Sequence, residues 1–414
     1  MLEHETRRAE VDSYALSLSE SRNKRRLEDE DNEGEAEASS RARVEFVEED
    51  GCMIEGLEVS LGSFVGSVAR NARPAETQKE KYFYTIGMNG IFDVSDSTSG
   101  SQMNELAVTN DKLDKIKKTM HMPSTIICDE YELLLENVNV DRREKESKQR
   151  KEWYQKIKQS HVKEDKKYKY YDSYIHILKL HRFYHHLFEQ PNNHSEMDFV
   201  IKFWSPLVEN AFRCSGINPH WGDTVPNVVT ASGLRLKMDL RLTDIADVNI
   251  PDYGCGEVAA ELFQHKYYKD KLKTVLAAKS HLNQLLESSD IAAPNIPAID
   301  YPFILISGYE IALYSMHMPY PGLYILEAVK QSWFPTINDE IRSHGIRDVL
   351  ALIDCYVGLC LSVKSRNQDK RDVHKVNSRK SMNDLTKIKF KSEGSSTTSS
   401  AVAWIRPLWA SSSV

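Results

Sequence analysis

One stretch of strict alternation between apolar and charged residues, residues 234–242, constrains the fold more than any other feature of the chain. Every second position from Leu234 to Leu242 is leucine or methionine, and the positions between are filled by Arg235, Lys237, Asp239 and Arg241. Successive side chains of a β-strand point to opposite faces of its sheet, so this pattern predicts a strand with one apolar and one polar face.

Helical spacing precedes and follows this strand. Residues 195–213 carry a helical apolar stripe behind Ser195, which is a suitable N-cap. Further helices are expected at 268–287 and 336–363, and further strands at 225–230, 254–262, 302–317 and 322–329. This order predicts an α/β fold in which helices flank a mixed β-sheet.

Charge is distributed unevenly along the 414 residues, although the net charge is only −7. Residues 27–60 hold 13 acidic residues, residues 142–182 hold 14 basic residues, and residues 364–391 hold 10 basic residues. We therefore expect a disordered acidic arm (1–50), a partly ordered region without an assignment (51–140), a basic and then aromatic helical region (141–194), the α/β domain (195–363) and a basic disordered tail (364–414).

The six cysteines are scattered without a CxxC pair, and the first ten residues lack the apolar core of a signal peptide. No run reaches the ~20 apolar residues that a membrane helix needs. These features predict a nuclear or cytoplasmic chain with reduced thiols that does not enter a membrane. The charged arms suit protein or nucleic-acid partners, and the oligomeric state is left open.

Two carboxylates stand out among the expected strands. Asp239 lies on the polar face of the alternating strand, and Glu257 lies on the next strand. If the two strands pair, both carboxylates project from one face. Such a pair suits Mg²⁺ or Mn²⁺, because hard cations prefer oxygen ligands. The alternative is that both acids form ordinary ion pairs on a half-exposed sheet.

The order of elements, with Asp239 in LKMDLRL and Glu257 in GEVAAE, resembles the PD-(D/E)XK nuclease-like superfamily. The resemblance covers roughly residues 196–330, under a third of the chain. The chain is also similar to uncharacterised fungal proteins that share its Trp-Ser-Pro helix and Gly-Glu-Val-Ala strand. The superfamily resemblance implies a divalent-metal nuclease of DNA or RNA, with Asp239 and Glu257 as metal ligands and Glu196 as a third acid.

The sequence departs from the superfamily pattern at Ala259, where a lysine is expected. Two lysines are substitutes: Lys237, on the same strand face as Asp239, and Lys279, within the apolar stripe of the 268–287 helix. Two alternatives to a nuclease remain. One is a non-catalytic scaffold that keeps the fold, and the other is a nucleic-acid-binding protein that has lost cleavage.

A basic and aromatic stretch precedes the domain. Lys166, Lys167 and Lys169 can contact phosphates, and Tyr170 can stack on a base. The alternative is a solvated helix face.

Overall fold

The computed structural model describes residues 50–54, 59–71, 77–106, 145–159, 165–189, 193–244, 250–261, 263–288, 291–384, 401 and 403–409. The chain divides into two units, Met1–Glu45 and Phe46–Val414, and every described residue lies in the second. The expected disordered segments at 1–49, 385–400 and 410–414 lie outside the described residues.

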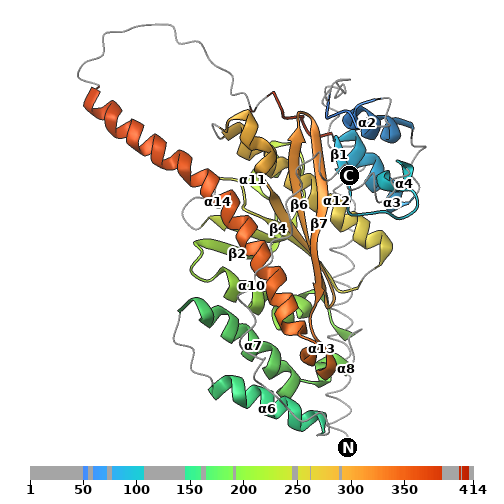
Figure 1. Cartoon of the computed structure of the whole chain (residues 1–414), viewed down its shortest axis with the longest axis vertical. Helices are drawn as coiled ribbons and strands as arrows, with labels where there is room; N and C mark the ends of the chain where they lie inside the picture. Colours follow the sequence, from blue (N-terminus) through green and yellow to red (C-terminus); the bar gives the residue numbers. More distant parts are fainter. Residues whose placement is uncertain are drawn as a thin grey trace, which may run out of the picture. The chain divides into compact units, whose positions relative to one another are not determined.

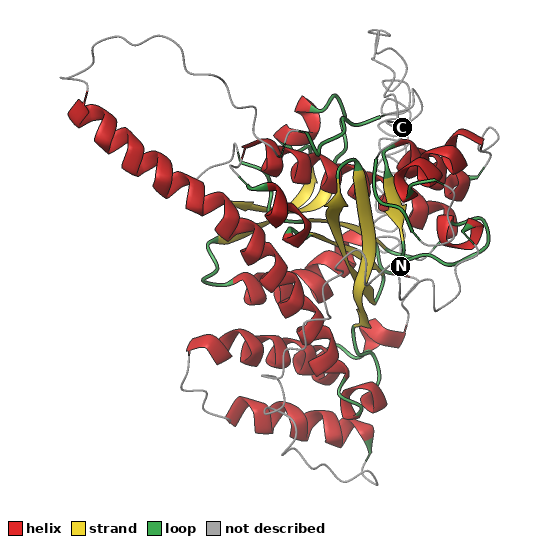
Figure 2. Ribbon diagram, turned by 45° about the horizontal axis from the view of Figure 1, so that its top comes forward, coloured by secondary structure: helices red, strands yellow, loops and turns green. Residues whose placement is uncertain are grey.

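A mixed sheet of seven strands organises the fold (Figures 1 and 2). Its order is β1-β7-β6-β5-β4-β3-β2; β1 pairs with β7 and β4 with β5 in parallel, and the other neighbours are antiparallel. The strands are β1 (Ile91–Asp93), β2 (Ile217–Thr224), β3 (Met238–Asp244), β4 (Cys255–Ala259), β5 (Tyr301–Ser307), β6 (Glu310–Tyr320) and β7 (Leu323–Trp333). The expected α/β fold with a mixed, helix-flanked sheet is therefore confirmed.

Strand β3 shows how alternation positions polar groups. Its residues are alternately buried and half-buried, with Met238, Leu240 and Leu242 on the buried side. The strand begins later than expected: residues 234–237 are not paired, although Leu234 and Leu236 are buried. Of the charged residues in the expected strand, only Asp239 and Arg241 therefore belong to the paired part of β3.

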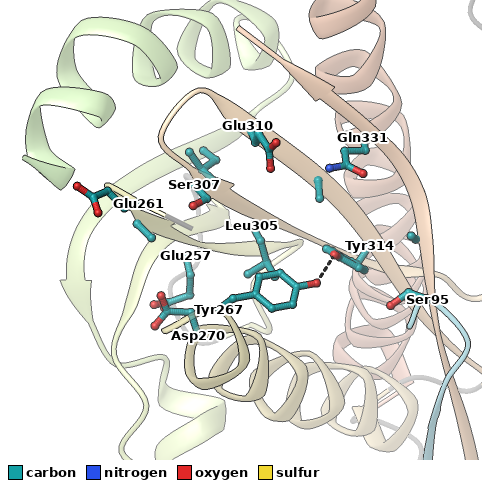
Figure 3. A pocket seen from close by; sticks show the side chains of 14 residues that line it. Ser95, Glu257, Glu261, Tyr267, Asp270, Leu305, Ser307, Glu310, Tyr314 and Gln331 are labelled. Carbon is teal, nitrogen blue, oxygen red and sulfur yellow. Dashed lines mark hydrogen bonds between the residues drawn. The ribbon is translucent and has the colours of Figure 1, made fainter. Parts of the chain in front are cut away.

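Two long helices cover the two faces of the sheet. Helix α12 (Gln264–Ser288) packs against β4, β5 and β6, and helix α14 (Gly345–Asp384) packs against β5 and β7. Figure 3 shows α12 in front of the strands and α14 behind them. Helix α14 also contacts α7 (Asp165–Phe183) and α10 (Ser205–Phe212), which extend its layer.

The expected helix at 195–213 is interrupted by a π-helical segment. Ser195 caps it as expected, accepting from the backbone N–H of Asp198 at 3.2 Å. The chain then passes from α9 (Glu196–Asp198) through the π-helix η3 (Phe199–Trp204) into α10. A π-turn inserts one extra residue and rotates the preceding side chains around the axis. Met197, expected in the apolar stripe, is therefore 56% exposed, whereas Phe199 and Phe203 are buried.

The edge of the sheet differs from the expectation at two places. The expected strand at 225–230 is wrong, because Asn227–Ala231 forms helix α11, which packs Val228 and Val229 into the core. The edge strand is instead β2, which the sequence pattern does not predict. Its residues are mostly solvated and include Pro219 and Gly222, so it lacks the apolar alternation of a half-buried strand.

The fold extends beyond the expected domain limits of 195 and 363. On the N-terminal side, α2 (Leu61–Asn71), α3 (Gln78–Met88) and α4 (Gln102–Glu105) surround β1. On the C-terminal side, α14 continues to Asp384, and Ala401 is buried in the main core. Arg406 ion-pairs with Asp50, so part of the expected C-terminal tail packs beside the N-terminal segment.

The remaining helices precede or follow the strands along the chain. Residues 141–194, expected as one helical region, contain α6 (Glu146–Gln159), α7 and α8 (His186–Glu189), while η4 (Ala293–Ala298) precedes β5 and α13 (Asn338–Arg342) precedes α14. Within the described ranges, no helix combines the length and apolar character that crossing a bilayer requires.

We predict that the two sides of the 234–242 alternation respond differently to truncation. Leu240 is 1% exposed, so Leu240→Ala should lower the free energy of unfolding by about 2–5 kcal/mol through lost burial and a cavity. Lys237 is exposed, so Lys237→Ala should change it by less than about 0.5 kcal/mol. Urea unfolding of both variants measures this, and similar losses would contradict the burial of Leu240 and the exposure of Lys237.

Candidate functional site

The structure brings Asp239 and Glu257 together on adjacent strands. Strands β3 and β4 are antiparallel with Leu240 opposite Gly256, which sets Asp239 opposite Glu257 one residue further along. The backbone N–H of Val258 on β4 donates to Asp239 Oδ2 on β3 at 2.8 Å and holds that carboxylate between the two strands. Residues directly opposite in a sheet project from the same face, so both acids point to the α12 side.

Glu257 is the more deeply buried acid. Its side chain is 3% exposed, and its Oε2 lies 2.5 Å from Lys273 Nζ on α12. Its Oε1 is buried and has no hydrogen-bond partner among the described residues. Burial raises the pKa of Glu257 well above its ordinary value, the Lys273 ammonium opposes that rise, and the negative charge of Asp239 adds to it. One oxygen of a buried carboxylate is therefore uncompensated.

Asp239 is half-buried and has a second acidic neighbour. Burial raises the pKa of Asp239 to about 6, while the Val258 N–H and the Lys273 charge oppose that rise. The neighbouring Asp223 carboxyl on β2 contributes to this raised pKa. Three neighbouring strands thus contribute one carboxylate each to the same side of the sheet.

Lys273 supplies the positive charge of the site from α12. Burial lowers the pKa of its ammonium, but the attraction of Glu257 and Asp239 outweighs burial, and the net shift is upward. Asp270, one turn earlier on α12, contributes to the same attraction. The charged form of Lys273 is therefore favoured beside the carboxylate pair.

A pocket of about 270 Å³ opens beside Glu257 (Figure 3). Its polar lining includes Glu257, Glu261, Asp270, Ser307, Glu310 and Gln331, and Tyr267 and Tyr314 meet across it with their hydroxyls 2.9 Å apart. Asp239 and Lys273 do not line the pocket and adjoin it through Glu257. The lining is therefore strongly acidic, which favours a cation.

Glu196, expected as the third acid, lies apart from the pair. The π-helical segment after α9 turns its side chain outward; it is 47% exposed and ion-pairs with Lys266 in the first turn of α12. Burial lowers the pKa of Lys266, Asp270 opposes this, and Lys273 reinforces it. Glu196 therefore reaches the site only through Lys266, and its expected place beside Asp239 and Glu257 is wrong.

Neither lysine proposed from the sequence reaches Glu257. Lys237 is exposed and precedes β3. Lys279 is buried, as its stripe indicates, but its Nζ donates to the carbonyl oxygens of Asn89 at 2.8 Å and Pro407 at 3.2 Å and lies 4.7 Å from the Tyr324 ring centroid. The position expected for Lys279 is wrong, because this lysine contacts Asn89 at the end of α3, the Tyr324 ring and the C-terminal segment at Pro407.

Lys273, which the sequence pattern does not single out, is the lysine that lies beside Glu257. It stands beside Leu272 at the edge of the apolar stripe of α12. From the sequence alone, Lys273 looks like a lysine exposed to solvent. Only the packing of α12 over β4 shows that its side chain reaches Glu257. The sequence feature that pointed to such a lysine is Ala259. Because the strand itself has no lysine at this position, a positive charge beside Glu257 must come from a neighbouring element.

The expected nucleic-acid contacts lie on α7. The side chains of Lys166, Lys167 and Lys169 lie outside those that the structure describes. Tyr170 is half-buried against the core, and its hydroxyl donates to Asp354 Oδ2 on α14 at 2.8 Å. The expected role of Tyr170 in base stacking is therefore not supported, because its ring packs inward.

No protein-family model matches this chain, and comparisons with curated proteins and with solved structures give no match.

We predict that Lys279 makes stability depend on pH. Burial and the Arg406 charge lower the pKa of Lys279 to about 7, with the Asp50 charge opposing them. The pKa of a lysine in the unfolded chain is about 10.4. Between these values the unfolded chain binds more protons, so the free energy of unfolding should rise with pH.

Urea unfolding of wild type and Lys279→Met at pH 7.5 and 9 isolates this contribution, since other groups titrate in both proteins. The wild type should gain up to about 1.4 kcal/mol per pH unit relative to the variant. An unchanged difference at the two pH values would contradict the expected titration of Lys279.

Proposed function

We propose that this chain is a divalent-metal-dependent nuclease with a PD-(D/E)XK-like core, acting on phosphodiesters of DNA or RNA. The observation that carries the proposal is the placement of Asp239 opposite Glu257 on paired strands, with Lys273 Nζ 2.5 Å from Glu257. These are the charge types that metal-assisted phosphodiester hydrolysis needs at one point.

The residues fit a hard divalent cation such as Mg²⁺ or Mn²⁺. Asp239 and Glu257 provide carboxylate oxygens from adjacent strands, and Glu257 Oε1 is buried without a hydrogen-bond partner in the described chain. A buried carboxylate oxygen needs a positive partner, and a cation between the two strands would provide it. Asp239 and Glu257 would hold the ion, and the carboxyl of Asp223 is a further acidic neighbour of Asp239.

When bound, such an ion activates a water and offsets charge on the phosphate. Lys273 stays charged beside Glu257 and can stabilise the negative charge that develops on the phosphate oxygens. Asp270 lines the pocket, and burial raises the pKa of its carboxyl, with Lys273 opposing that rise. Its carboxylate can accept a proton from the attacking water.

The small side chain of Ala259 supports the displacement of the lysine. Ala259 lines the pocket two residues after Glu257, where the superfamily pattern expects lysine. An alanine there leaves the pocket open, while Lys273 brings an ammonium group to Glu257 from the facing helix. We therefore interpret the departure from the pattern as a change in the element that supplies the charge.

The acidic lining has a consequence for binding. Glu261 and Glu310 line the pocket together with Glu257 and Asp270, and a carboxylate repels the negative charge of a phosphate. Nucleic acid should therefore bind at this pocket only together with a divalent cation, unlike binding through the basic residues of α7.

We predict that single-site changes abolish metal-dependent cleavage. Glu257→Gln, Asp239→Asn and Lys273→Met should each lower the cleavage rate of plasmid DNA or RNA in Mg²⁺ or Mn²⁺ by about 100-fold or more, because each removes a metal ligand or the stabilising charge. Lys269→Met is the matched control, since Lys269 is an exposed lysine one turn earlier on the same helix.

Equal cleavage by wild type and Glu257→Gln would place the activity elsewhere or in a contaminant. Absence of cleavage by the wild type, together with cation-independent binding of nucleic acid, would favour the non-catalytic alternative.

A further inference from the structure

A second group of potential metal ligands lies on the opposite face of the sheet. Strand pairing puts Tyr301 opposite Met316, and the next pair outward is Asp300 and His317. Tyr301 stacks on His281 of α12, so Asp300 and His317 point to the other face, where Arg366 of α14 acts on the charge of Asp300.

Glu327 reaches the same place from β7. It pairs with Ser315, which is two residues before His317 on β6 and whose hydroxyl donates to Asp300 Oδ1 at 3.1 Å. One ligand atom from each of Asp300, His317 and Glu327 lies within 4.8 Å of the other two. The start of β5 and the strands β6 and β7 therefore each contribute one donor to a single point.

His317 is the observation that points to a ligand. Its side chain is 0% exposed, and neither ring nitrogen has a hydrogen-bond partner in the described part of the chain. Its Nδ1 lies 3.8 Å from Asp300 Oδ1, which is too long for a hydrogen bond. Buried imidazoles are normally hydrogen-bonded, and a neutral ring always keeps one nitrogen lone pair, so His317 has a lone pair available to ligate a metal ion.

We propose that Asp300, His317 and Glu327 form a transition-metal site, and that its ion is Zn²⁺. One imidazole nitrogen with two carboxylate oxygens suits zinc better than Mg²⁺, which prefers oxygen ligands and water. Ligands about 2.1 Å from zinc stand about 3.5 Å apart, so side-chain rotations must draw the three donors slightly closer together.

Asp300 is the most exposed of the three ligands. The side chain of Asp300 is 17% exposed and Glu327 is 9% exposed, while His317 lies beneath them. An ion held there joins β6 and β7 to Asp300, the residue just before β5, so binding should stabilise this end of the sheet. The site lies on the α14 face and the proposed nuclease site on the α12 face, and the two proposals are independent.

Zinc binding to the full-length, chelator-treated protein tests the proposal, by calorimetry and by the shift in Tm. The wild type should bind Zn²⁺ at micromolar or lower concentration with a raised Tm, and millimolar Mg²⁺ should not displace it. His317→Gln should weaken binding by at least about tenfold. His220→Gln, at an exposed histidine of β2, should not.

Glu327→Gln provides a second test should the buried His317 variant fail to fold, and it should also weaken zinc binding by at least about tenfold. Glu257→Gln should leave zinc affinity unchanged, which separates this site from the nuclease site. The proposal is overturned if the folded wild type binds no zinc, or if Glu327→Gln and foldable His317 variants keep wild-type affinity.

Discussion

The ion pair between Glu257 and Lys273 is the interaction around which the candidate site is built. A carboxylate with 3% exposure in the middle of a sheet is unfavourable unless an opposite charge compensates it. The ammonium of Lys273 does so for one oxygen, and the other oxygen stays without a hydrogen-bond partner among the described residues. Well-packed apolar side chains at both positions would stabilise such a core at least as well. A role of Glu257 and Lys273 in chemistry therefore explains this ion pair better than a role in stabilising the fold does.

Helix α12 carries Lys273 and two further lysines, both buried, Lys271 and Lys279. Lys271 Nζ lies 2.7 Å from Asp93 at the end of β1, with both side chains fully buried. Lys279, two turns later, donates to Asn89 and Pro407. Three lysines of one helix thus connect it to the N-terminal segment, to β4 and to the C-terminal segment. This explains why residues before 195 and after 363 belong to the fold that holds the site.

The sequence was sufficient for the two acids and insufficient for the lysine. Asp239 could be placed because strand alternation assigns each residue to a face, and pairing with the next strand then fixed Glu257. Lys273 could not be chosen over Lys279, because helical spacing gives the direction of a side chain and not the strand that it covers. The packing of α12 against β4, β5 and β6 decides that, and such packing is not visible in a local sequence pattern.

The other errors have equally local causes. Because of the π-helical turn after α9, the side chains of Glu196 and Met197 point away from their expected directions. No residue type in Phe199–Trp204 predicts such a turn. Edge strand β2 carries no apolar alternation, since one of its sides is unpaired and much of it is solvated. Regular, half-buried elements could therefore be predicted, whereas the edge and the irregular helix could not.

The central claim is that Asp239 and Glu257 together hold a divalent cation. Crystals of the full chain grown with Mn²⁺ and measured for its anomalous scattering test this most directly. We expect a peak within about 2.0–2.4 Å of an oxygen of each carboxylate, on the α12 face of the sheet. A well-ordered site without such a peak at saturating Mn²⁺ would contradict the claim.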